Sequence, residues 1–499
     1  MDRPWALWIS PVARAAAAHA LIWSVAPALL VGNLHQDTLE AAYWGDEPSL
    51  AFARHPPLLS LMIRGALGVG HAPIFLLLLM SQVGMVVAAV YVWRSARLYG
   101  GPPTAAVAVM LFLISLAATF FAVQVNHNSM LAPFWAATLY YGLSYFERER
   151  GRDAVCLGVA AGLGLLVKYE LALLLACLFL LCLVVRRYRS VFRRGMTYVA
   201  LVICAAILTP HVLDLLRSGG AAADYALRGH KVVEASGVAR SAFNLLVGQF
   251  VLFAPPAALL VMVTRVDGVA LHRVVWRHEK AVIAAMLAFG PSVTMAAAVI
   301  ATHQVAQPLW ALPLASSCAV GLTLLFPGAP AAPRGESLIA GKIVLFSGVA
   351  AAAFVAYLYI ADAVGAAIGR PLTFYAADSR RLAAAVTEFW DSHARGPVKC
   401  VVIAEAALGA STVLWLRSRP RYVDFDHAEW SRPEDVRRCA GTGGVAILTH
   451  TRRDELIFKA YPALRTAPRR AFAAPGVFGF SHYQWRADLL LLPPVTASR

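Results

Sequence analysis

Residue types that serve in group-transfer chemistry gather in the segment 34–72, which joins two apolar runs. Asp37 and Glu40 are three residues apart, so on a helix their side chains share a face. An aromatic pair follows, and then Arg54 and His55 precede two prolines. A carboxylate can take a proton from an attacking group, and a cation can stabilise negative charge on a leaving group. The alternative for the same residues is a solvated loop, with the prolines as a helix-start signal.

Ionisable residues also stand at other breaks between apolar runs. The further candidates for contacting a substrate are His127, Lys168, Tyr169, Arg228, Lys231 and His303. Lys168 is the most informative of these, because an ammonium at mid-membrane costs about 2.5–3.5 kcal/mol, and less near an interface. Its structural alternative is an anchor that reaches the membrane surface. Taken together, the polar breaks predict a site that opens toward one face of a membrane.

The elements that position these residues follow from the composition of the 499-residue chain. Hydrophobic residues make up 59%, the mean hydropathy is +0.63 and only 14% of residues are charged, against roughly a quarter in soluble domains. This excludes a disordered, collagen-like or disulfide-stapled chain and disfavours a soluble enzyme. Apolar runs of about 18 residues or more predict an all-α polytopic membrane domain. Its eleven expected transmembrane helices lie near residues 13–33, 73–93, 104–124, 129–146, 154–169, 170–186, 197–216, 246–264, 281–301, 308–326 and 342–362.

Positively charged residues in the short loops predict how these helices cross the membrane. One set of loops holds 18 Lys and Arg residues and the opposite set holds 7, so the first set is expected in the cytoplasm. The N-terminus is then cytoplasmic and the C-terminal part periplasmic, in a multi-pass protein of the inner membrane. The net charge of +16 comes largely from short clusters between apolar runs. Such clusters are typical of membrane topology, so nucleic acid is not an expected partner.

Two domains are predicted. A membrane domain covers residues 1–362, with 34–72 as its first periplasmic loop, and a small soluble α/β domain covers 363–499. In the second domain charged residues return, and short β-rich runs alternate with helical stretches. The helices expected there cover residues 381–390 and 408–416. Cys400 and Cys439 adjoin β-rich runs, so a disulfide between them is expected in an oxidising periplasm, with two free thiols as the alternative.

Four stretches of the sequence resemble the membrane glycosyltransferases of family 39, relatives of protein O-mannosyltransferases and of the lipid A aminoarabinose transferase. They read DTLEAAYWG…ARHPPLLSLMIR, NHNSMLAPFWA, GLGLLVKYELALLL and QPLWALPL, and the resemblance covers roughly residues 10–326. It implies the GT-C fold and agrees with the eleven-helix layout. Many relatives carry an adjacent Asp-Glu pair after the first span, whereas Asp37 and Glu40 are separated in this chain.

The resemblance implies a sugar donor linked through phosphate to a polyprenol. The acceptor is a lipid, a glycan or a protein on the periplasmic face, and the enzyme is a hexosyl- or pentosyltransferase that also contacts membrane lipids. Inverting displacement at the anomeric carbon needs a base that takes a proton from the acceptor. Asp37 is the candidate base and Glu40 the runner-up.

The phosphate leaving group needs charge stabilisation more than protonation. The cationic candidates for this role are Lys168 and Arg54, with Arg228 or Lys231 behind them. The candidates for orienting the sugar or the acceptor, or for holding a divalent metal ion, are Glu40, His55 and His127.

Two other classes of protein remain open at this point. A multi-span transporter or lipid flippase is the main alternative, and it predicts charges buried in mid-span and symmetric halves, neither of which is evident. A non-catalytic membrane scaffold with an outside domain is the second, and it should tolerate the substitution Asp37→Asn.

Overall fold

The computed structural model describes residues 10–45, 50–52, 55–217, 234–264, 278–303, 305, 308–325, 335–368, 372–373, 375, 377–403, 406–424, 433–450, 454–475, 478 and 484–492. Its internal contacts divide the chain into two compact units. The first unit comprises Met1–Val25, Glu47–Met62 and Leu78–Ala351, and the second comprises Ala26–Asp46, Ile63–Leu77 and Ala352–Arg499. The expected domain boundary at residue 363 stays a prediction.

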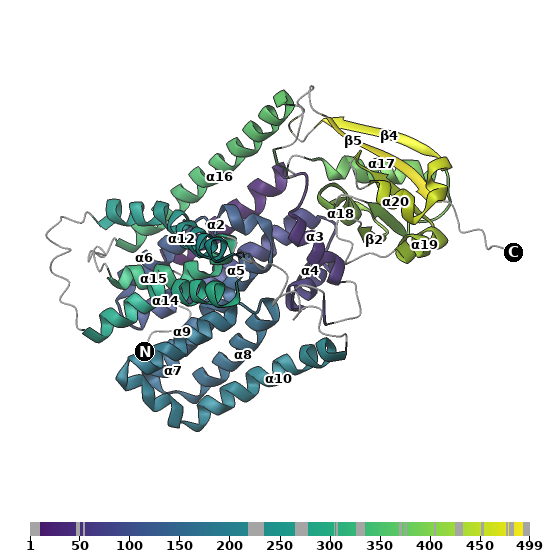
Figure 1. The fold of residues 1–499 in the computed structure, drawn as a ribbon. Coiled ribbons are helices and arrows are strands. Elements are labelled where there is room, and N and C mark those ends of the chain that lie inside the picture. Colours follow the sequence, from purple (N-terminus) through teal and green to yellow (C-terminus); the bar gives the residue numbers. More distant parts are fainter. Residues whose placement is uncertain are drawn as a thin grey trace. The chain divides into compact units, whose positions relative to one another are not determined.

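Helices build almost all of the first unit (Figure 1). The α-helices that contribute to it are α2 (Pro11–Leu30), α4 (Leu58–Gly68), α5 (Pro73–Arg97), α6 (Pro102–Leu113), α7 (His127–Arg148), α8 (Gly151–Val167), α9 (Leu171–Val184), α10 (Gly195–Arg217), α12 (Ala235–Thr264), α14 (His278–Thr302), α15 (Ala315–Leu325) and α16 (Gly335–Ile368). Three 3-10 helices accompany them, η1 (Phe120–Gln124), η2 (Arg186–Arg193) and η3 (Pro308–Leu314). Each of the eleven predicted spans overlaps at least one of these helices, and the expected number of eleven crossings stays a prediction. The break predicted around Lys168 and Tyr169 separates α8 from α9.

Six of the described helices are long and apolar enough to cross a membrane. They cover Pro11–Leu30, Pro73–Arg97, Gly195–Arg217, Ser236–Phe253, Glu279–Thr302 and Glu336–Ile368. A seventh crossing is counted if α9 and η2, which meet at a bend of 112°, form one span. Three shorter apolar helices cover Leu58–Gly68, Pro102–Leu113 and Leu309–Leu325. The prediction of a helical multi-pass membrane protein is therefore confirmed.

Small residues allow close helix packing in the first unit. A Cβ added to Gly158 of α8 would lie 2.5 Å from the carbonyl oxygen of Ala200 in α10, closer than a real side chain allows. Gly321 has the same role between α15 and α14, where an added Cβ would lie 2.2 Å from the backbone nitrogen of Ala288. In a membrane such residues let helix backbones approach, and van der Waals contact then holds the helices together.

A five-stranded mixed sheet in the order β2-β1-β3-β5-β4 forms the core of the C-terminal region (Figure 1). Its strands are β1 (Cys400–Ile403), β2 (Arg421–Asp424), β3 (Gly444–Leu448), β4 (Arg469–Pro475) and β5 (Gln484–Leu492). The strands β2, β1 and β3 are parallel, whereas β5 runs antiparallel to both β3 and β4. Both β1 and β3 are buried along their whole length, as expected for parallel strands that are covered on both faces.

Helices accompany this sheet and confirm the α/β character predicted for the region. They are α17 (Ser379–Asp391), α18 (Ala406–Trp415), α19 (Pro433–Thr442), α20 (Asp454–Ala460) and the 3-10 helix η5 (Pro462–Thr466). The predicted helices over 381–390 and 408–416 correspond to α17 and α18. Because α18 connects the parallel strands β1 and β2, it supplies the long crossover that parallel pairing requires.

A helix from the N-terminal part of the chain also belongs to the second unit. The helix α3 (Gln36–Gly45) packs against α18. Its Tyr43 meets Tyr422 of β2 edge to face, with ring centroids 5.8 Å apart. The segment that carries Asp37 and Glu40 is therefore held by the C-terminal region of the chain.

A disulfide joins Cys400, at the start of β1, to Cys439 in α19, with Cα atoms 5.4 Å apart. This separation lies within the range that a disulfide requires, so the expected pairing is present. Both residues are buried in the apolar cluster that surrounds the sheet. The bond thus links strand β1 to helix α19, which comes much later in the sequence.

We expect the double substitution Cys400→Ser/Cys439→Ser to lower the free energy of unfolding of the C-terminal region by about 2–4 kcal/mol. That is the usual contribution of a disulfide that closes a loop of several tens of residues. Resistance of the sheet region to protease during heating, under non-reducing conditions, is the measurement. The variant Cys156→Ser/Cys204→Ser, which removes two free thiols, is the control. Equal resistance of the first variant and the wild type would contradict the expectation.

Candidate functional site

A buried lysine lies at the break between α8 and α9. Lys168 is only 8% exposed. Its Nζ forms an ion pair with Glu170 Oε1 at 2.6 Å and donates a hydrogen bond to Asn128 Oδ1, also at 2.6 Å. The ring of Trp310 in η3 lies 5.4 Å from the ammonium, within cation–π range. We call these four side chains the Lys168 cluster, and all of them belong to the first unit.

Backbone geometry at two helix ends holds this cluster together. At Lys168 the chain is extended, with φ −159° and ψ 134°, so α8 ends there and the side chain leaves the helix surface. Asn128 stands in the first turn of α7, which is fixed by a capping box. In that box the side chain of Asn126 accepts hydrogen bonds from the backbone N–H groups of Asn128 and Ser129. Such caps satisfy donors that a helix start otherwise leaves unpaired.

The Lys168 cluster keeps hydrogen-bonding capacity that the described part of the chain does not use. Among the described residues, no hydrogen-bond partner reaches the buried Glu170 Oε2 or the buried Nε2 of His127, which stands next to Asn128. The ammonium of Lys168 has three donors, and two described acceptors take two of them. Leaving a buried polar atom unpaired costs about 1–3 kcal/mol, and such atoms are rare in native proteins. A polar ligand that offers both donors and acceptors would satisfy these groups.

Two histidines adjoin the cluster. His55 and His127 stack with ring centroids 4.0 Å apart and planes inclined by 32°. His127 opens α7, is buried, and lies within electrostatic range of both His55 and Lys168. The structure therefore brings together three of the predicted substrate-binding residues, and a fourth, Tyr169, follows Lys168 directly.

Two side chains of α10, His211 and Asp214, hold Leu50 by hydrogen bonds, and His211 also contacts Tyr169. We call these two side chains the clamp. His211 Nδ1 lies 2.7 Å from the Leu50 carbonyl oxygen, and its Nε2 lies 2.6 Å from the Tyr169 hydroxyl. Because a carbonyl oxygen only accepts, Nδ1 donates to Leu50, and Nε2 pairs with the Tyr169 hydroxyl. Asp214 Oδ2 accepts the Leu50 N–H at 2.7 Å. Both backbone groups of Leu50 are thereby held, which fixes the chain five residues before His55.

The two predicted catalytic carboxylates share α3, in the second unit. Asp37 stands in the first turn, where a carboxylate favourably faces the helix dipole, and its side chain is 42% exposed. Glu40 lies one turn later and is only 7% exposed. The two therefore differ in their access to a substrate from solution.

His35 borders Asp37. Its Nδ1 accepts a hydrogen bond from the backbone N–H of Asp37 at 3.2 Å and lies 3.7 Å from the Asp37 carboxylate. Burial lowers the pKa of His35, and the negative charge of Asp37 offsets that lowering in part. The ring is therefore neutral at neutral pH, and it leaves the charge of Asp37 uncompensated by an imidazolium.

The remaining candidates are placed less centrally. His303 is exposed directly after α14. Arg54, Arg228 and Lys231 lie outside the described residues. Within the described ranges, no three His, Cys, Asp or Glu side chains are grouped to hold a metal ion. The expected divalent ion stays a prediction, and no step proposed below passes through it.

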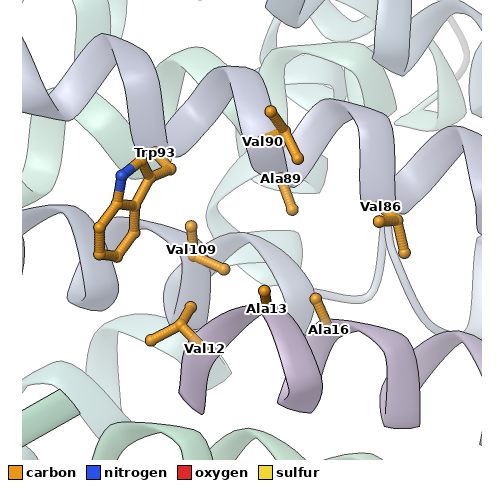
Figure 2. Close-up of a pocket in the computed structure, with 8 residues that line it drawn as sticks. All are labelled: Val12, Ala13, Ala16, Val86, Ala89, Val90, Trp93 and Val109. Carbon is orange, nitrogen blue, oxygen red and sulfur yellow. The ribbon is translucent and has the colours of Figure 1, made fainter. Parts of the chain in front are cut away.

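An apolar cavity of about 30 Å³ lies elsewhere in the first unit, among α2, α5 and α6 (Figure 2). Its lining residues are Val12, Ala13, Ala16, Val86, Ala89, Val90, Trp93 and Val109. None of these side chains titrates, so the cavity offers no acid, base or charge for catalysis. The described polar helix breaks, in contrast, carry ionisable side chains.

The closest partners of Lys168 were not singled out as binding residues from the sequence. Asn128 and Glu170 each stand one residue from a predicted candidate, and Trp310 lies in one of the four stretches that carry the resemblance. A weak signal was therefore present in the polar breaks. No local pattern reveals that Lys168 and Asn128 meet, because they are 40 residues apart in the chain.

Comparison with known proteins gives one family match and several similar solved structures. The model of the family described as dolichyl-phosphate-mannose-protein mannosyltransferase matches residues 54–213. That range contains His55, His127 and Lys168 together with the clamp residue His211. No curated protein matches the sequence significantly.

The fold is similar to that of ArnT from Cupriavidus metallidurans in two crystal structures. The structure bound to undecaprenyl phosphate superposes with a TM-score of 0.64 at 14% sequence identity and covers 98% of each chain. The apo structure gives 0.62 at 12% identity and covers 96% of this chain and 97% of the other. The family match and the fold together confirm the predicted resemblance to GT-C membrane glycosyltransferases. They support a membrane glycosyltransferase of the ArnT and mannosyltransferase type.

We expect the double substitution His211→Ala/Asp214→Ala to free Leu50 without dissolving the helices. Both hydrogen bonds to the Leu50 backbone, of about 0.5–1.5 kcal/mol each, are lost together with the bond between His211 and Tyr169. Amide hydrogen exchange in the peptide that contains Leu50 should therefore accelerate roughly tenfold or more. The control is Thr209→Ala. Thr209 lies in the same helix, and its substitution removes only a hydrogen bond to the carbonyl of Ala205. Unchanged exchange at Leu50 in the double variant would show that the clamp does not hold the loop.

Proposed function

We propose that the protein transfers a sugar from a polyprenyl-phosphate donor to a lipid, glycan or protein acceptor at the periplasmic face of the inner membrane, with inversion at the anomeric carbon. The observation that carries this proposal is the Lys168 cluster, a buried ammonium with unused hydrogen-bonding capacity at a helix break. The family match over residues 54–213 includes the lysine. The similar ArnT fold was crystallised with undecaprenyl phosphate, which supports a donor of the same lipid class.

Lys168 is proposed to bind the donor phosphate. A phosphate oxygen can take the third donor of the ammonium, and it competes with Glu170 Oε1 for a second. The ring of Trp310 shields one side of the ammonium, which strengthens a charge interaction by excluding water. Negative charge grows on the bridging oxygen as the bond to the sugar breaks, so an ammonium at this point stabilises the transition state more than the ground state.

Asp37 is proposed as the base. The acceptor oxygen or nitrogen attacks the anomeric carbon while its proton passes to the Asp37 carboxylate, and the sugar–phosphate bond breaks with its electrons on the leaving polyprenyl phosphate. Exposure favours Asp37 over Glu40, since 42% of its side chain is accessible and Glu40 is largely buried.

Substitution of the lysine tests the donor site. We expect Lys168→Met to lower kcat/KM for a polyprenyl-phosphate sugar by roughly 10- to 100-fold, because a charged hydrogen bond worth about 1.5–3 kcal/mol is lost. The variant Lys168→Met/Glu170→Gln removes both members of the ion pair and avoids leaving a buried unpaired carboxylate. Lys280→Met, at an exposed position of α14, is the control. Full transfer activity in both Lys168 variants would reduce the lysine to a structural anchor.

Substitution of the carboxylates tests the base. We expect Asp37→Asn to lower kcat by about 10²–10⁴-fold, the usual contribution of general-base catalysis, with the protein still folded in the membrane. Loss of a favourable helix-terminal charge alone would cost only about 0.3–1 kcal/mol of stability and no turnover. The assay is transfer in vitro by purified protein, with Glu40→Gln run alongside. Near-normal turnover by Asp37→Asn with loss in Glu40→Gln would move the base to Glu40, and normal turnover by both would refute the mechanism.

A further inference from the structure

A strongly basic segment follows α9 and does not continue its direction. The 3-10 helix η2 meets α9 at a bend of 112°. Residues 186–194 contain five arginines, and α10 starts directly afterwards at Gly195. The segment therefore turns across the end of α9 before the chain re-enters an apolar helix. We call it the basic turn.

Two of the five arginines fasten the basic turn to neighbouring helices. Arg187 makes two hydrogen bonds to Glu147 at 2.9 and 2.6 Å, and its Nε lies 3.2 Å from Glu279. Arg194 pairs with Glu149. Apolar packing supports the same arrangement, because Tyr188 and Val191 are buried on the inner side of η2. These contacts hold the basic turn against neighbouring helices, unlike a loop that makes no such contacts.

The other three arginines take no part in these contacts. Arg186, Arg189 and Arg193 are exposed, and none of them pairs with a carboxylate in the described part of the chain. Arg189 uses its Nε to donate to the carbonyl of Leu183, which leaves the end of the guanidinium available. Three neighbouring cations without counter-charges repel one another, and an anion that binds them relieves the repulsion.

Exposed apolar residues flank these cations on both sides. Leu183 and Val184, in the last turn of α9, are 41% and 56% exposed, and Tyr198 and Val199, in the first turns of α10, are 57% and 40% exposed. Cations beside a hydrocarbon-compatible surface are the complement of an amphiphile with a negative head and apolar tails. Guanidinium groups bind phosphate oxygens in paired hydrogen bonds, which suits a phosphodiester head.

We propose that the basic turn binds the phosphate headgroup of an anionic glycerophospholipid through Arg186, Arg189 and Arg193. The acyl chains of that lipid lie against the exposed ends of α9 and α10. This site is separate from the Lys168 cluster, because the 14 residues of α9 place the two at opposite ends of a helix about 21 Å long. The proposal is also independent of the proposed transfer reaction, since it rests on a different surface and a different ligand.

Native mass spectrometry of the full-length protein tests the proposal. Dioleoylphosphatidylglycerol should be retained in preference to dioleoylphosphatidylcholine. A cationic residue near a membrane surface is worth about fivefold in affinity, so Arg186→Gln/Arg189→Gln/Arg193→Gln should lower the affinity for the anionic lipid by at least about tenfold. Binding of the zwitterionic lipid should not change.

A matched control separates a site from net charge. The variant Arg395→Gln/Lys399→Gln/Arg417→Gln loses the same three positive charges from exposed positions around the C-terminal sheet, and it should keep the lipid preference. Equal retention by the Arg186 triple variant and the wild type would overturn the proposal. Equal loss in the control, or displacement of the lipid by millimolar inorganic phosphate alone, would overturn it as well.

Discussion

An ammonium in an apolar setting must be paired and hydrogen-bonded, and much of the first unit is organised around meeting that requirement at Lys168. Glu170 supplies the countercharge from the start of α9, and Asn128 supplies an amide oxygen from the capped start of α7. The ring of Trp310 makes a cation–π contact with the ammonium. Three helix breaks therefore contribute side chains around one cation, since a buried charge without a partner is costly.

Close helix packing makes this arrangement possible. Gly158 lets α8 and α10 approach to backbone contact, so Tyr169, just past the end of α8, reaches His211 on α10. His211 in turn holds the carbonyl of Leu50. Leu50 stands five residues before His55, whose ring stacks on that of His127.

The extent of the likeness to known proteins differs between sequence and fold. The family match covers residues 54–213, which include the Lys168 cluster apart from Trp310, whereas the likeness of fold to ArnT covers 98% of the chain at 14% identity. Apolar helices and a buried sheet tolerate exchange of one hydrophobic residue for another as long as volume and pattern are kept. A recognisable sequence signal is then expected where polar residues are buried, because few residue types satisfy such positions.

Four features could be predicted from the amino-acid sequence: the helical membrane part, the break at Lys168, the α/β character of the C-terminal region and the unusual position of the lysine. Each of these depends on local periodicity and composition. Three-dimensional contacts were needed to show that Lys168 meets Asn128, that His211 reaches Leu50 161 residues away, and that Asp37 is half-exposed while Glu40 is buried. The tertiary structure also brought Cys400 and Cys439 within bonding distance. These facts depend on contacts between segments far apart in the chain. Hydrophobic periodicity shows which face of a helix is buried, but it does not show which segment packs against that face.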